Sequence, residues 1–361
     1  MNDRLRLTGP TNCSLNVTNR CNLTCLHCSA SANSARSDEM SFPQIVSLLD
    51  SLERIGLCRI DITGGEPLVR EDLFEILAIL KSKRIPAKLL TNATLITSQV
   101  AQRLLREAHI TDVAVSLDGA GPDTHDALRG RGAFERTTRG IRALKEAGFR
   151  VHAGCVVSRL NMHELSEIAG LAKALGMTIV LDSVSPVGRA LANRDAFSFT
   201  RAEQREVFFN VVALMHEHDN VSGGTVLEWP IGKIERSHGL PPLGRPGRHL
   251  AHCSICKESV AIAANGDVIP CNNFQGYILG NVLHQDILEI YHSESARRIR
   301  ELSTLTSDQL DGCQDCDYAG YCGGGCRALA YLATGSLKGA DPTRCIRQCM
   351  EDRLECESKL T

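Results

Sequence analysis

The sequence predicts an α/β fold built on a parallel sheet, and three observations support this prediction. Short β-rich runs alternate with segments whose apolar residues recur at helical spacing over residues 13–185. Ser41 and Ser98 precede two of the helical segments as plausible N-caps, and Gly148 and Gly176 stand where two others should end. Repeated strand–helix units imply right-handed crossovers, so the sheet is either open or curved into a barrel. The expected strands are too few for a complete eight-stranded barrel, so the barrel alternative is a partial one.

The individual elements follow from the same patterns. The β-rich runs are 14–18, 59–63, 87–90, 112–117, 150–157 and 178–181. The helical segments are 42–55, 72–82, 98–108, 134–147 and 162–174, with a longer polar helix at 200–217. Glycine and proline recur from about residue 222, as in a linker. We therefore expect a barrel over 10–220, a linker or bridge over 221–248, and a cysteine-rich domain over 249–361 that includes an amphipathic stretch at 344–357.

Composition narrows the class of protein. The 361 residues are 43% hydrophobic, which is enough apolar material for a sizeable core. The formal net charge of −2 gives no electrostatic case for general binding of nucleic acid or of acidic membranes. The chain has no apolar run near the roughly 20 residues of a membrane span and no secretory signal before the first motif, so we expect a cytoplasmic protein.

Sixteen cysteines are the most unusual feature of the composition. They fall in closely spaced groups in a chain of enzyme length without an export signal. In a reducing cytosol such groups favour metal or cluster ligation over disulfides.

The first group has the spacing CxxxCxxC and follows the first expected strand. Its members are Cys21, Cys25 and Cys28. Three thiolates on one loop can bind three irons of a [4Fe–4S] cube and leave the fourth iron open to a ligand. A structural zinc site, with His27 or a distant residue as the fourth ligand, is the alternative that the spacing alone leaves open.

The second expected strand ends in a glycine pair followed by an acidic residue. The residues are Gly64, Gly65, Glu66 and Pro67. They are expected at the same end of the sheet as the cysteine loop, where active sites of α/β barrels gather. Glycines let the backbone approach a ligand closely, and a carboxylate can accept a hydrogen bond from an ammonium group. Taken alone, the same residues also fit an ordinary strand–helix turn.

Together the two motifs resemble the radical S-adenosylmethionine (SAM) superfamily. The resemblance implies a partial (β/α)6 TIM-type barrel in which SAM binds the open iron through its amino and carboxylate groups. It implies that the segment 64–67 holds the methionyl amine and that Ser116, within 115–119, contacts the ribose. The stretch 125–129 also resembles a recurrent segment of peptide-modifying members. Its Arg129 is a further candidate, although an arginine on a loop is usually just solvated.

The cysteines near the carboxyl end resemble the SPASM extension, which carries two auxiliary [4Fe–4S] clusters. The resemblance implies two interleaved ligand sets: Cys253, Cys256, Cys271 and Cys326 for the nearer cluster, and Cys313, Cys316, Cys322 and Cys345 for the farther one. Each cluster would join distant segments, so the domain should depend on them for its order. A pair of zinc sites is the alternative reading of the paired CxxC units.

Five cysteines remain outside these sets. They are Cys13, Cys58, Cys155, Cys349 and Cys356. Cys58 and Cys155 lie in or beside expected strands and are interpreted as small buried hydrophobes. Cys349 and Cys356 could be substitute ligands or redox-active thiols, but inert packing is the favoured interpretation.

The resemblance also implies the chemistry. An electron from the first cluster cleaves SAM to methionine and a 5′-deoxyadenosyl radical, which then removes a hydrogen atom from the substrate. Such hard chemistry belongs to the cofactors, while the protein binds, orients and excludes water. The auxiliary clusters could accept or relay an electron or ligate substrate, and two complete ligand sets favour electron transfer. An external donor such as flavodoxin or ferredoxin is expected.

The substrate is expected to be a ribosomally made peptide that is crosslinked or decarboxylated. The stretch His27–Ala32 resembles mycofactocin-maturase and haem-pathway members. Sulfatase-maturing enzymes carry an aspartate base where this chain has Asn272, so formylglycine formation is disfavoured. Cys21 lies too near the amino terminus for a fused peptide-recognition domain, so a separate leader-binding protein or an unfused mode is expected.

Two other functions stay open from the sequence. The first is oxidation or decarboxylation of a small molecule, such as a tetrapyrrole intermediate. The second is an electron carrier or a zinc-binding interaction protein without catalysis. The second is disfavoured because such a protein has no use for the SAM-binding segments at 64–67 and 116.

Overall fold

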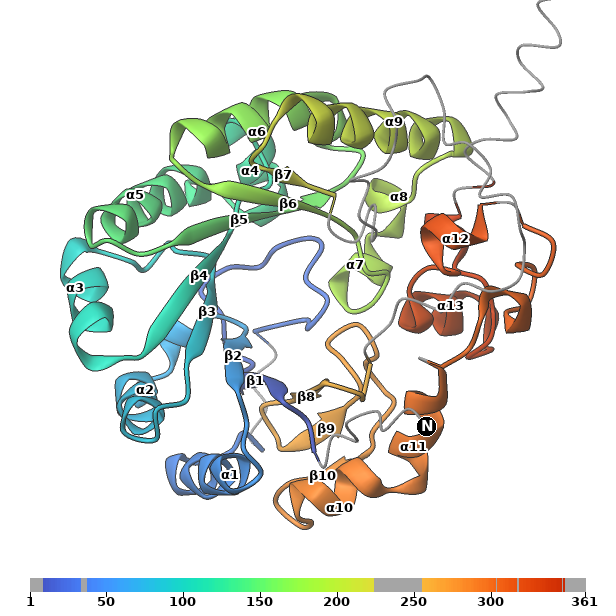
Figure 1. Ribbon diagram of the computed structural model, residues 1–361. Helices are drawn as coiled ribbons and strands as arrows, with labels where there is room; N and C mark the ends of the chain where they lie inside the picture. The colour runs from blue at the N-terminus through green and yellow to red at the C-terminus, as the bar shows by residue number, and fades with distance from the viewer. Residues whose placement is uncertain are drawn as a thin grey trace, which may run out of the picture.

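A curved sheet forms the centre of the molecule. The computed structural model describes residues 9–33, 38–223, 255–302, 304–316, 318–345 and 347. Within these residues the sheet has ten strands in the order β10-β9-β8-β1-β2-β3-β4-β5-β6-β7. Figure 1 shows it as an arc with the helices on its outer side. The arc is the predicted partial barrel, and its first six strands are β1 (Asn12–Thr18), β2 (Arg59–Gly64), β3 (Ala87–Thr91), β4 (Ile110–Ser116), β5 (Val151–Val157) and β6 (Thr178–Ser183).

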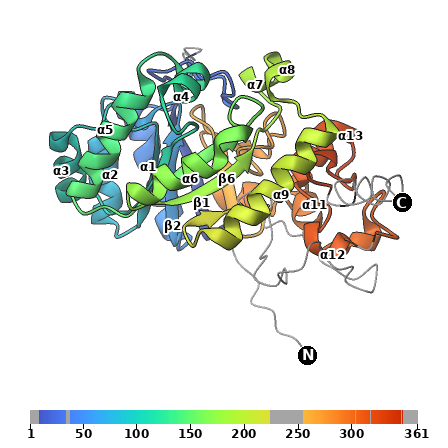
Figure 2. The same ribbon diagram turned by 90° about the horizontal axis from the view of Figure 1, so that it is seen from above.

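The helices alternate with these strands as the sequence predicts. Figure 2 shows them arranged around the sheet. Those that cover it are α1 (Phe42–Arg54), α2 (Leu73–Ser82), α3 (Ser98–Glu107), α5 (Ala133–Glu146), α6 (Leu165–Ala174) and α9 (Arg201–Glu217). Ser41 caps α1 as predicted, in a capping box with Gln44. The cap of α3 is Thr97 instead of Ser98, because the Thr97 hydroxyl accepts from the Val100 amide.

Short helices and 3-10 turns connect the longer elements. Around the carboxyl ends of the strands they include α4 (Pro122–Arg129), α7 (Arg189–Ala192), α8 (Arg194–Phe197), η1 (Pro67–Val69) and η2 (Met162–Glu164). In the cysteine-rich part they are α10 (Ile287–His292), α11 (Glu294–Leu302), α12 (Ala319–Cys322), α13 (Arg327–Thr334), η3 (Ser307–Gln309) and η4 (Pro342–Arg344). This part therefore contains only short elements, as its sequence predicts.

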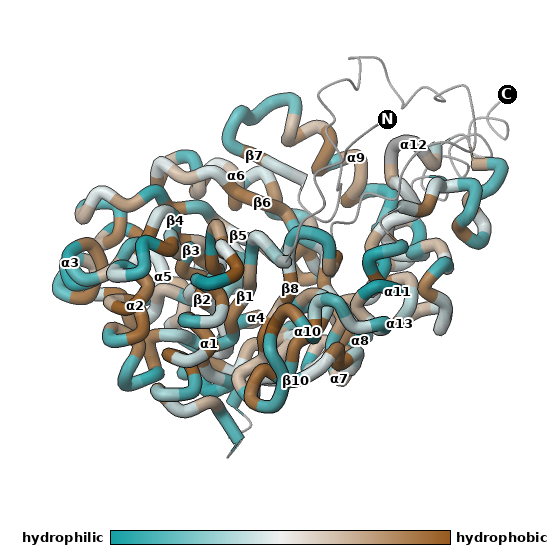
Figure 3. Tube along the Cα trace, turned by 60° about the horizontal axis from the view of Figure 1, so that its bottom comes forward, coloured by the Kyte–Doolittle hydropathy of each residue, from teal (hydrophilic) through white to brown (hydrophobic). Residues whose placement is uncertain are grey.

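The two faces of the sheet differ because side chains alternate along each strand. Leu15, Ile62 and Leu89 are completely buried on the outer face, beneath the helices. In Figure 3 hydrophobic stretches follow the strands, and many outer turns are hydrophilic. The inner face carries a row of polar residues. Ser14 lies opposite Asp61 in the register of β1 and β2, and Asp61 lies opposite Lys88 in the register of β2 and β3. The open side of the barrel is therefore lined with polar groups.

The cysteine-rich part continues the same sheet. Its strand β8 (Ser259–Ile262) pairs in parallel with β1, and β9 (Asp267–Ile269) and β10 (Gly280–Asn281) follow as antiparallel strands. At the opposite end of the sheet, β7 (Val221–Ser222) pairs with β6. The linker and the boundaries at 220 and 249 remain predictions, because residues 224–254 lie outside the described part.

Two smaller expectations have different outcomes. Cys155 is completely buried, as predicted, whereas Cys58 is exposed, because it lies in the turn before β2. Cys349, Cys356 and nearly all of the stretch 344–357 lie outside the described residues. In the described part of the chain, no helix is long and apolar enough to cross a membrane.

Candidate functional site

The first three predicted ligands lie on one loop at the carboxyl end of β1. Cys21 and Cys28 pack against a small buried cluster that contains Cys25 and Leu23. Backbone amides donate to two of the sulfurs: Leu23 to Cys21 and Ala32 to Cys28, each at 3.4 Å. The loop therefore brings the three thiols together, as predicted, and presents N–H donors to sulfur.

A second segment holds this loop from the side of β6. The Arg189 amide donates to the Cys28 carbonyl at 3.0 Å, and its Nε donates to the Cys25 carbonyl at 2.8 Å. Gly188 (φ +60°) lies so close that a Cβ atom there would meet the Ser29 carbonyl oxygen. In Figure 1 the blue cysteine loop accordingly lies beside α7. This contact could not be predicted from the sequence, since residues 188–189 match no motif.

The glycine pair after β2 approaches the same loop from the other side. The Gly65 amide donates to the Thr18 carbonyl at 2.8 Å, and a Cβ atom on Gly65 would meet the Arg20 carbonyl oxygen. A Cβ atom on Gly64 (φ +140°) would meet the Thr18 carbonyl oxygen. The close approach that was expected toward a ligand is therefore also made to the backbone of the cysteine loop.

Glu66 is completely buried and carries no ion pair within the described residues. Its carboxylate accepts from Thr91 Oγ1 and from the Asn92 amide, both at 2.8 Å, and from the Leu68 amide at 3.2 Å. Desolvation raises the pKa of Glu66 to about 7, although these three donors lower it. Pro67 follows as the first residue of η1 and is also buried. Glu66 thereby joins the ends of β2 and β3.

Asn92, just after the end of β3, also contacts the cysteine loop. Its side chain donates to Asn22 Oδ1 at 2.9 Å and lies 3.9 Å from Cys21 Sγ. Ser116, the predicted ribose contact, lies half-buried at the carboxyl end of β4. Gly64 ends β2 and Ser116 ends β4, two parallel strands of the sheet that β3 separates. No sequence motif singled out Asn92.

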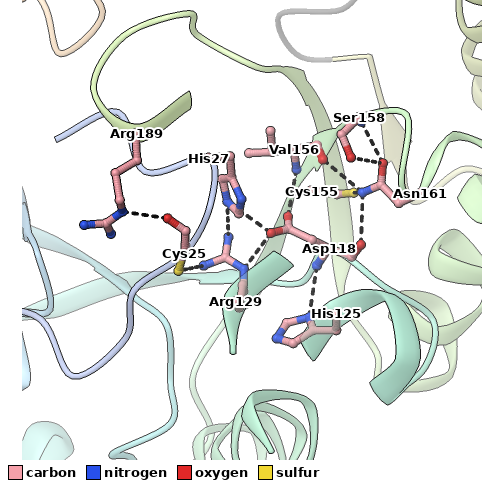
Figure 4. Close-up of polar contacts among 10 residues, drawn as sticks. All are labelled: Cys25, His27, Asp118, His125, Arg129, Cys155, Val156, Ser158, Asn161 and Arg189. Atoms are coloured by element: carbon pink, nitrogen blue, oxygen red, sulfur yellow. Dashed lines mark hydrogen bonds and ion pairs between the residues drawn. The ribbon is translucent and has the colours of Figure 1, made fainter. Parts of the chain in front are cut away.

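A buried polar network lies just beyond β4 (Figure 4). Asp118 is completely buried and accepts from Arg129 Nε at 2.6 Å and from the Val156 amide at 2.8 Å. Arg129 Nη1 lies 3.9 Å from Cys25 Sγ. The expectation of a solvated arginine on a loop is wrong: Arg129 ends α4 and is 7% exposed, because the carboxylate pairs with it inside the protein.

His27 belongs to the same network. Its Nε2 lies 3.2 Å from Asp118 Oδ2 and 3.3 Å from Arg129 Nη2, so its tautomer decides whether it donates to the first or accepts from the second. Its Nδ1 is buried and has no hydrogen-bond partner among the described residues. Burial lowers the pKa of His27 to about 4, so the ring is neutral. One ring nitrogen is therefore engaged away from the cysteines.

The farther C-terminal ligand set is also brought together. Cys316 and Cys345 raise the pKa of Cys313 through their charges, and Cys345, Cys313 and Cys316 do the same for Cys322, so these four thiols are electrostatic neighbours. Burial is the largest cause of both shifts and raises the pKa of Cys313 to about 11 and that of Cys322 to about 12. Cys313 and Cys322 thus stay protonated at neutral pH unless a metal replaces the proton.

The nearer set is described in part. Cys253 lies outside the described residues, and Cys256 is completely buried just before β8. The segments that carry Cys271 and Cys326 meet, since the rings of Phe274 and Tyr331 lie 5.3 Å apart. The structure therefore joins these two segments and leaves the full set of four as a prediction.

The loop after Cys271 also touches the inner face of the barrel. Asn272 Nδ2 donates to Ser14 Oγ at 2.9 Å, and Asn273 Oδ1 accepts from Ser185 Oγ at 2.8 Å. Among the described residues, Asn272 Oδ1 is buried without a hydrogen-bond partner. The cysteine-rich part thus places an amide oxygen beside the polar inner face of the barrel.

The donor chemistry of the first loop fits a [4Fe–4S] cluster. Soft thiolates with N–H donors on their sulfurs are the usual environment of such clusters. Burial raises the pKa of Cys21 to about 11, and it also raises the pKa of Cys25, against the charge of Arg129. Among the described residues, no three histidine, cysteine or acidic side chains form a group suited to one metal ion. A cube differs from such a site because each thiolate binds its own iron.

Comparisons with known proteins agree with this geometry. A model of the radical SAM superfamily matches residues 15–172, and one of the SPASM iron–sulfur cluster-binding domain matches residues 253–317. Mycofactocin maturase MftC of Mycolicibacterium smegmatis is 32% identical over 345 residues, covering 93% of this chain and 81% of that protein. The AdoMet-dependent heme synthase of Methanosarcina barkeri is 29% identical and covers 90% and 93%.

A solved structure has the same fold. anSMEcpe with bound AdoMet and the Cp18Cys peptide superposes with a TM-score of 0.71 at 17% identity, covering 97% of this chain and 98% of that one. The chain therefore belongs to the radical SAM superfamily and carries a SPASM domain. It is an enzyme whose cofactors are SAM and [4Fe–4S] clusters.

Proposed function

We propose that this enzyme oxidatively modifies a ribosomally made peptide, by forming a crosslink or by decarboxylation. The observation that carries the proposal is the 32% identity with a mycofactocin maturase over nearly the whole chain. Cys21, Cys25 and Cys28 would hold the first cluster, which together with SAM and a supplied electron would provide the radical chemistry that removes a hydrogen atom from the substrate. The protein's own residues bind and orient the reactants and exclude water.

We propose residue roles for this site from their positions. Cys21, Cys25 and Cys28 hold the first cluster, and the fourth iron is left to SAM. The segment 64–67 binds the methionyl amine, and Ser116 contacts the ribose. These groups lie at or just after the carboxyl ends of β1, β2 and β4, which belong to one run of parallel strands, and this position supports the assignment.

The auxiliary clusters are proposed to take up or relay the electron that remains on the product. Cys253, Cys256, Cys271 and Cys326 would hold the nearer cluster, and Cys313, Cys316, Cys322 and Cys345 the farther one. The mutual electrostatic effects within the second set support its grouping. Cys271 precedes Asn272, which touches the barrel, so the nearer cluster would lie on the substrate side.

The partners and the compartment belong to the same proposal. A one-electron donor such as flavodoxin or ferredoxin would reduce the first cluster, and a separate leader-binding protein could present the peptide. We place the enzyme in the cytoplasm, where thiols stay reduced for cluster assembly. Formylglycine formation is disfavoured because the carboxamide of Asn272 cannot take up a proton as a base.

A second candidate is the oxidation or decarboxylation of a tetrapyrrole or other small molecule. The similarity to AdoMet-dependent heme synthases, at 29% identity over 90% of the chain, favours it. The two candidates predict different substrates but the same cleavage of SAM.

The test begins with the chain reconstituted anaerobically with iron and sulfide, then reduced with dithionite in the presence of SAM. We expect 5′-deoxyadenosine and roughly twelve irons per chain, four for each cluster. If an intact, reduced cluster yields no 5′-deoxyadenosine, the chain does not cleave SAM and the proposed activity is wrong. An iron content that stays at about four per chain would contradict the presence of auxiliary clusters.

Coexpression of the enzyme with a short peptide encoded beside its gene then distinguishes between the two candidate substrates. We expect a change in peptide mass that needs both SAM and Cys25, as measured by mass spectrometry. An unchanged peptide, together with turnover of a tetrapyrrole by the same preparation, would replace the first candidate by the second.

A further inference from the structure

All three guanidinium nitrogens of Arg129 face partners inside the protein (Figure 4). Nε donates to Asp118 at 2.6 Å, Nη1 lies 3.9 Å from Cys25 Sγ, and Nη2 lies 3.3 Å from His27 Nε2. The residue is 7% exposed and permanently charged. It is therefore oriented toward the cysteine loop by protein contacts alone.

The carboxylate that holds Arg129 is itself fixed on several sides. Asp118 Oδ1 accepts from the Val156 amide at 2.8 Å, and the Asp118 amide donates to His125 Nδ1 at 3.2 Å. The Asp118 carbonyl accepts from Asn161 Nδ2 at 2.9 Å. Removing one partner from such a buried pair leaves the other charge uncompensated, so the pair resists separation.

Arg129 is the buried cation that lies beside the Cys25 sulfur, with Nη1 at 3.9 Å from Sγ. Arg189, by contrast, donates through Nε to the Cys25 carbonyl at 2.8 Å. Asp118 contacts Arg129 and His27, so its carboxylate lies on the far side of the guanidinium group. The sulfur therefore faces a buried cation with the matching anion behind it.

We propose that Arg129, anchored by Asp118, is a positioning residue that raises the reduction potential of the cluster held by Cys25. The inference rests on the proposed ligation by Cys25. Reduction adds one negative charge to the cluster, and a buried cation with an N–H directed at a sulfur ligand stabilises that charge. Net charge and hydrogen bonds to sulfur are two of the factors that set the potentials of such clusters.

The experiment is a redox titration of the full-length, reconstituted chain, followed by EPR. The signal of the first cluster is identified as the one that changes on addition of SAM and is absent from Cys25→Ala. We compare Arg129→Met and Arg129→Gln, which remove the charge, with Arg129→Lys, which keeps the charge but loses the planar fork. Arg139→Met is the matched control, because Arg139 is exposed and, within the part of the chain that the structure describes, forms an ion pair only with Glu135 on the same helix.

We expect both neutral variants to shift the potential of the first cluster to a more negative value, and Arg129→Lys to shift it less. The auxiliary signals and the Arg139→Met control should not move. If Arg129→Met does not retain iron, Arg129→Gln supplies the neutral variant. Neutral variants that keep the wild-type potential, or raise it, would overturn the proposal.

The proposed function fails in a different way. If the signal that responds to SAM persists in Cys25→Ala, the ligand assignment is wrong. If the wild-type chain shows no such signal, the first cluster itself is absent. Both results differ from the one that would overturn the role of Arg129, in which the variants keep the EPR signal of the first cluster and its wild-type reduction potential.

Discussion

Several ionisable side chains at this site are buried. Glu66, Asp118 and Arg129 lie in or near the protein interior, where a charge is costly unless it is paired or hydrogen-bonded. Asp118 and Arg129 pair with each other, whereas Glu66 relies on three hydrogen-bond donors. Burial without an opposite charge raises the pKa of Glu66 to about 7, so its protonation changes near neutral pH.

Glu66→Gln should remove a pH dependence from the stability of the fold. The pKa of Glu66 is about 7 in the folded protein, against an ordinary value of 4.5. The folded state therefore keeps a proton that the unfolded state has lost, and this stability disappears as the pH rises through about 7. Denaturant unfolding at pH 6 and pH 8 should show the wild type losing about 1.4 kcal/mol more than the variant. Equal losses would contradict the raised pKa.

Two cysteine variants should separate the cluster roles. Cys25→Ala removes one of the three proposed ligands of the first cluster, so SAM cleavage should stop while the auxiliary clusters remain visible by EPR. Cys316→Ala, in the farther set, should instead damage folding or turnover. Product analysis and iron content measure both effects, and unaltered product formation by Cys316→Ala would remove it from the ligand set.

At the scale of elements, the cysteine loop is held between two glycine-dependent contacts. The turn after β2 meets it at Thr18 and Arg20, and the Gly188–Arg189 segment meets it at Cys28 and Ser29. Neither contact involves a helix longer than four residues. The loop's position thus depends on close backbone approach, which an added methyl group disrupts.

Gly188→Ala should destabilise the folded chain by about 1–3 kcal/mol, since it adds a Cβ atom at a positive φ against the Ser29 carbonyl. We expect a lower denaturation midpoint and a reduced yield of the first cluster. Gly170→Ala in α6 is the matched control, because its Cβ would meet nothing within 4 Å. It should leave the cluster intact, and two variants with the same iron content would contradict the role of Gly188.

The longer helices and strands were predictable because their apolar residues recur with a clear helical or strand period. All six barrel strands and the six long helices occur where the alternation of apolar residues placed them, with boundaries that differ by a few residues. The short helix α4 was missed, since eight residues with three buried side chains carry too little periodicity. The first thiol group followed from its CxxxCxxC spacing, and the two C-terminal sets followed from the resemblance to the SPASM extension. Asn92 and Arg189 reach the loop from 71 and 164 positions away, which no local pattern encodes.

The whole molecule is organised around one sheet that both parts share. β1 lies between β2 of the barrel and β8 of the cysteine-rich part. A further contact joins the two parts at α9, where Gln204 Nε2 donates to the Thr343 carbonyl at 2.6 Å. The parts are therefore continuous in hydrogen bonding and in the main hydrophobic core.

The two parts should unfold together as one cooperative unit. Separating β8 from β1 would expose backbone hydrogen-bonding groups along one edge of the seven-residue strand β1, so we expect no stable intermediate in which only one part is folded. Thermal unfolding followed by far-UV circular dichroism and by cluster absorbance should give coincident transitions. Two transitions separated in temperature would contradict a shared sheet as the basis of stability.

The pairing of β1 with β8 also sets an order of events during synthesis. Thr11, just before β1, hydrogen-bonds to Glu258, just before β8, across 247 positions, so β1 is synthesised long before its partner strand. Contacts of such long range form late, and an open strand edge is prone to misassembly until they do. The edge that carries the first cysteine loop is thus closed only when the cysteine-rich part arrives, which makes timely metal delivery to that part a condition for producing intact enzyme.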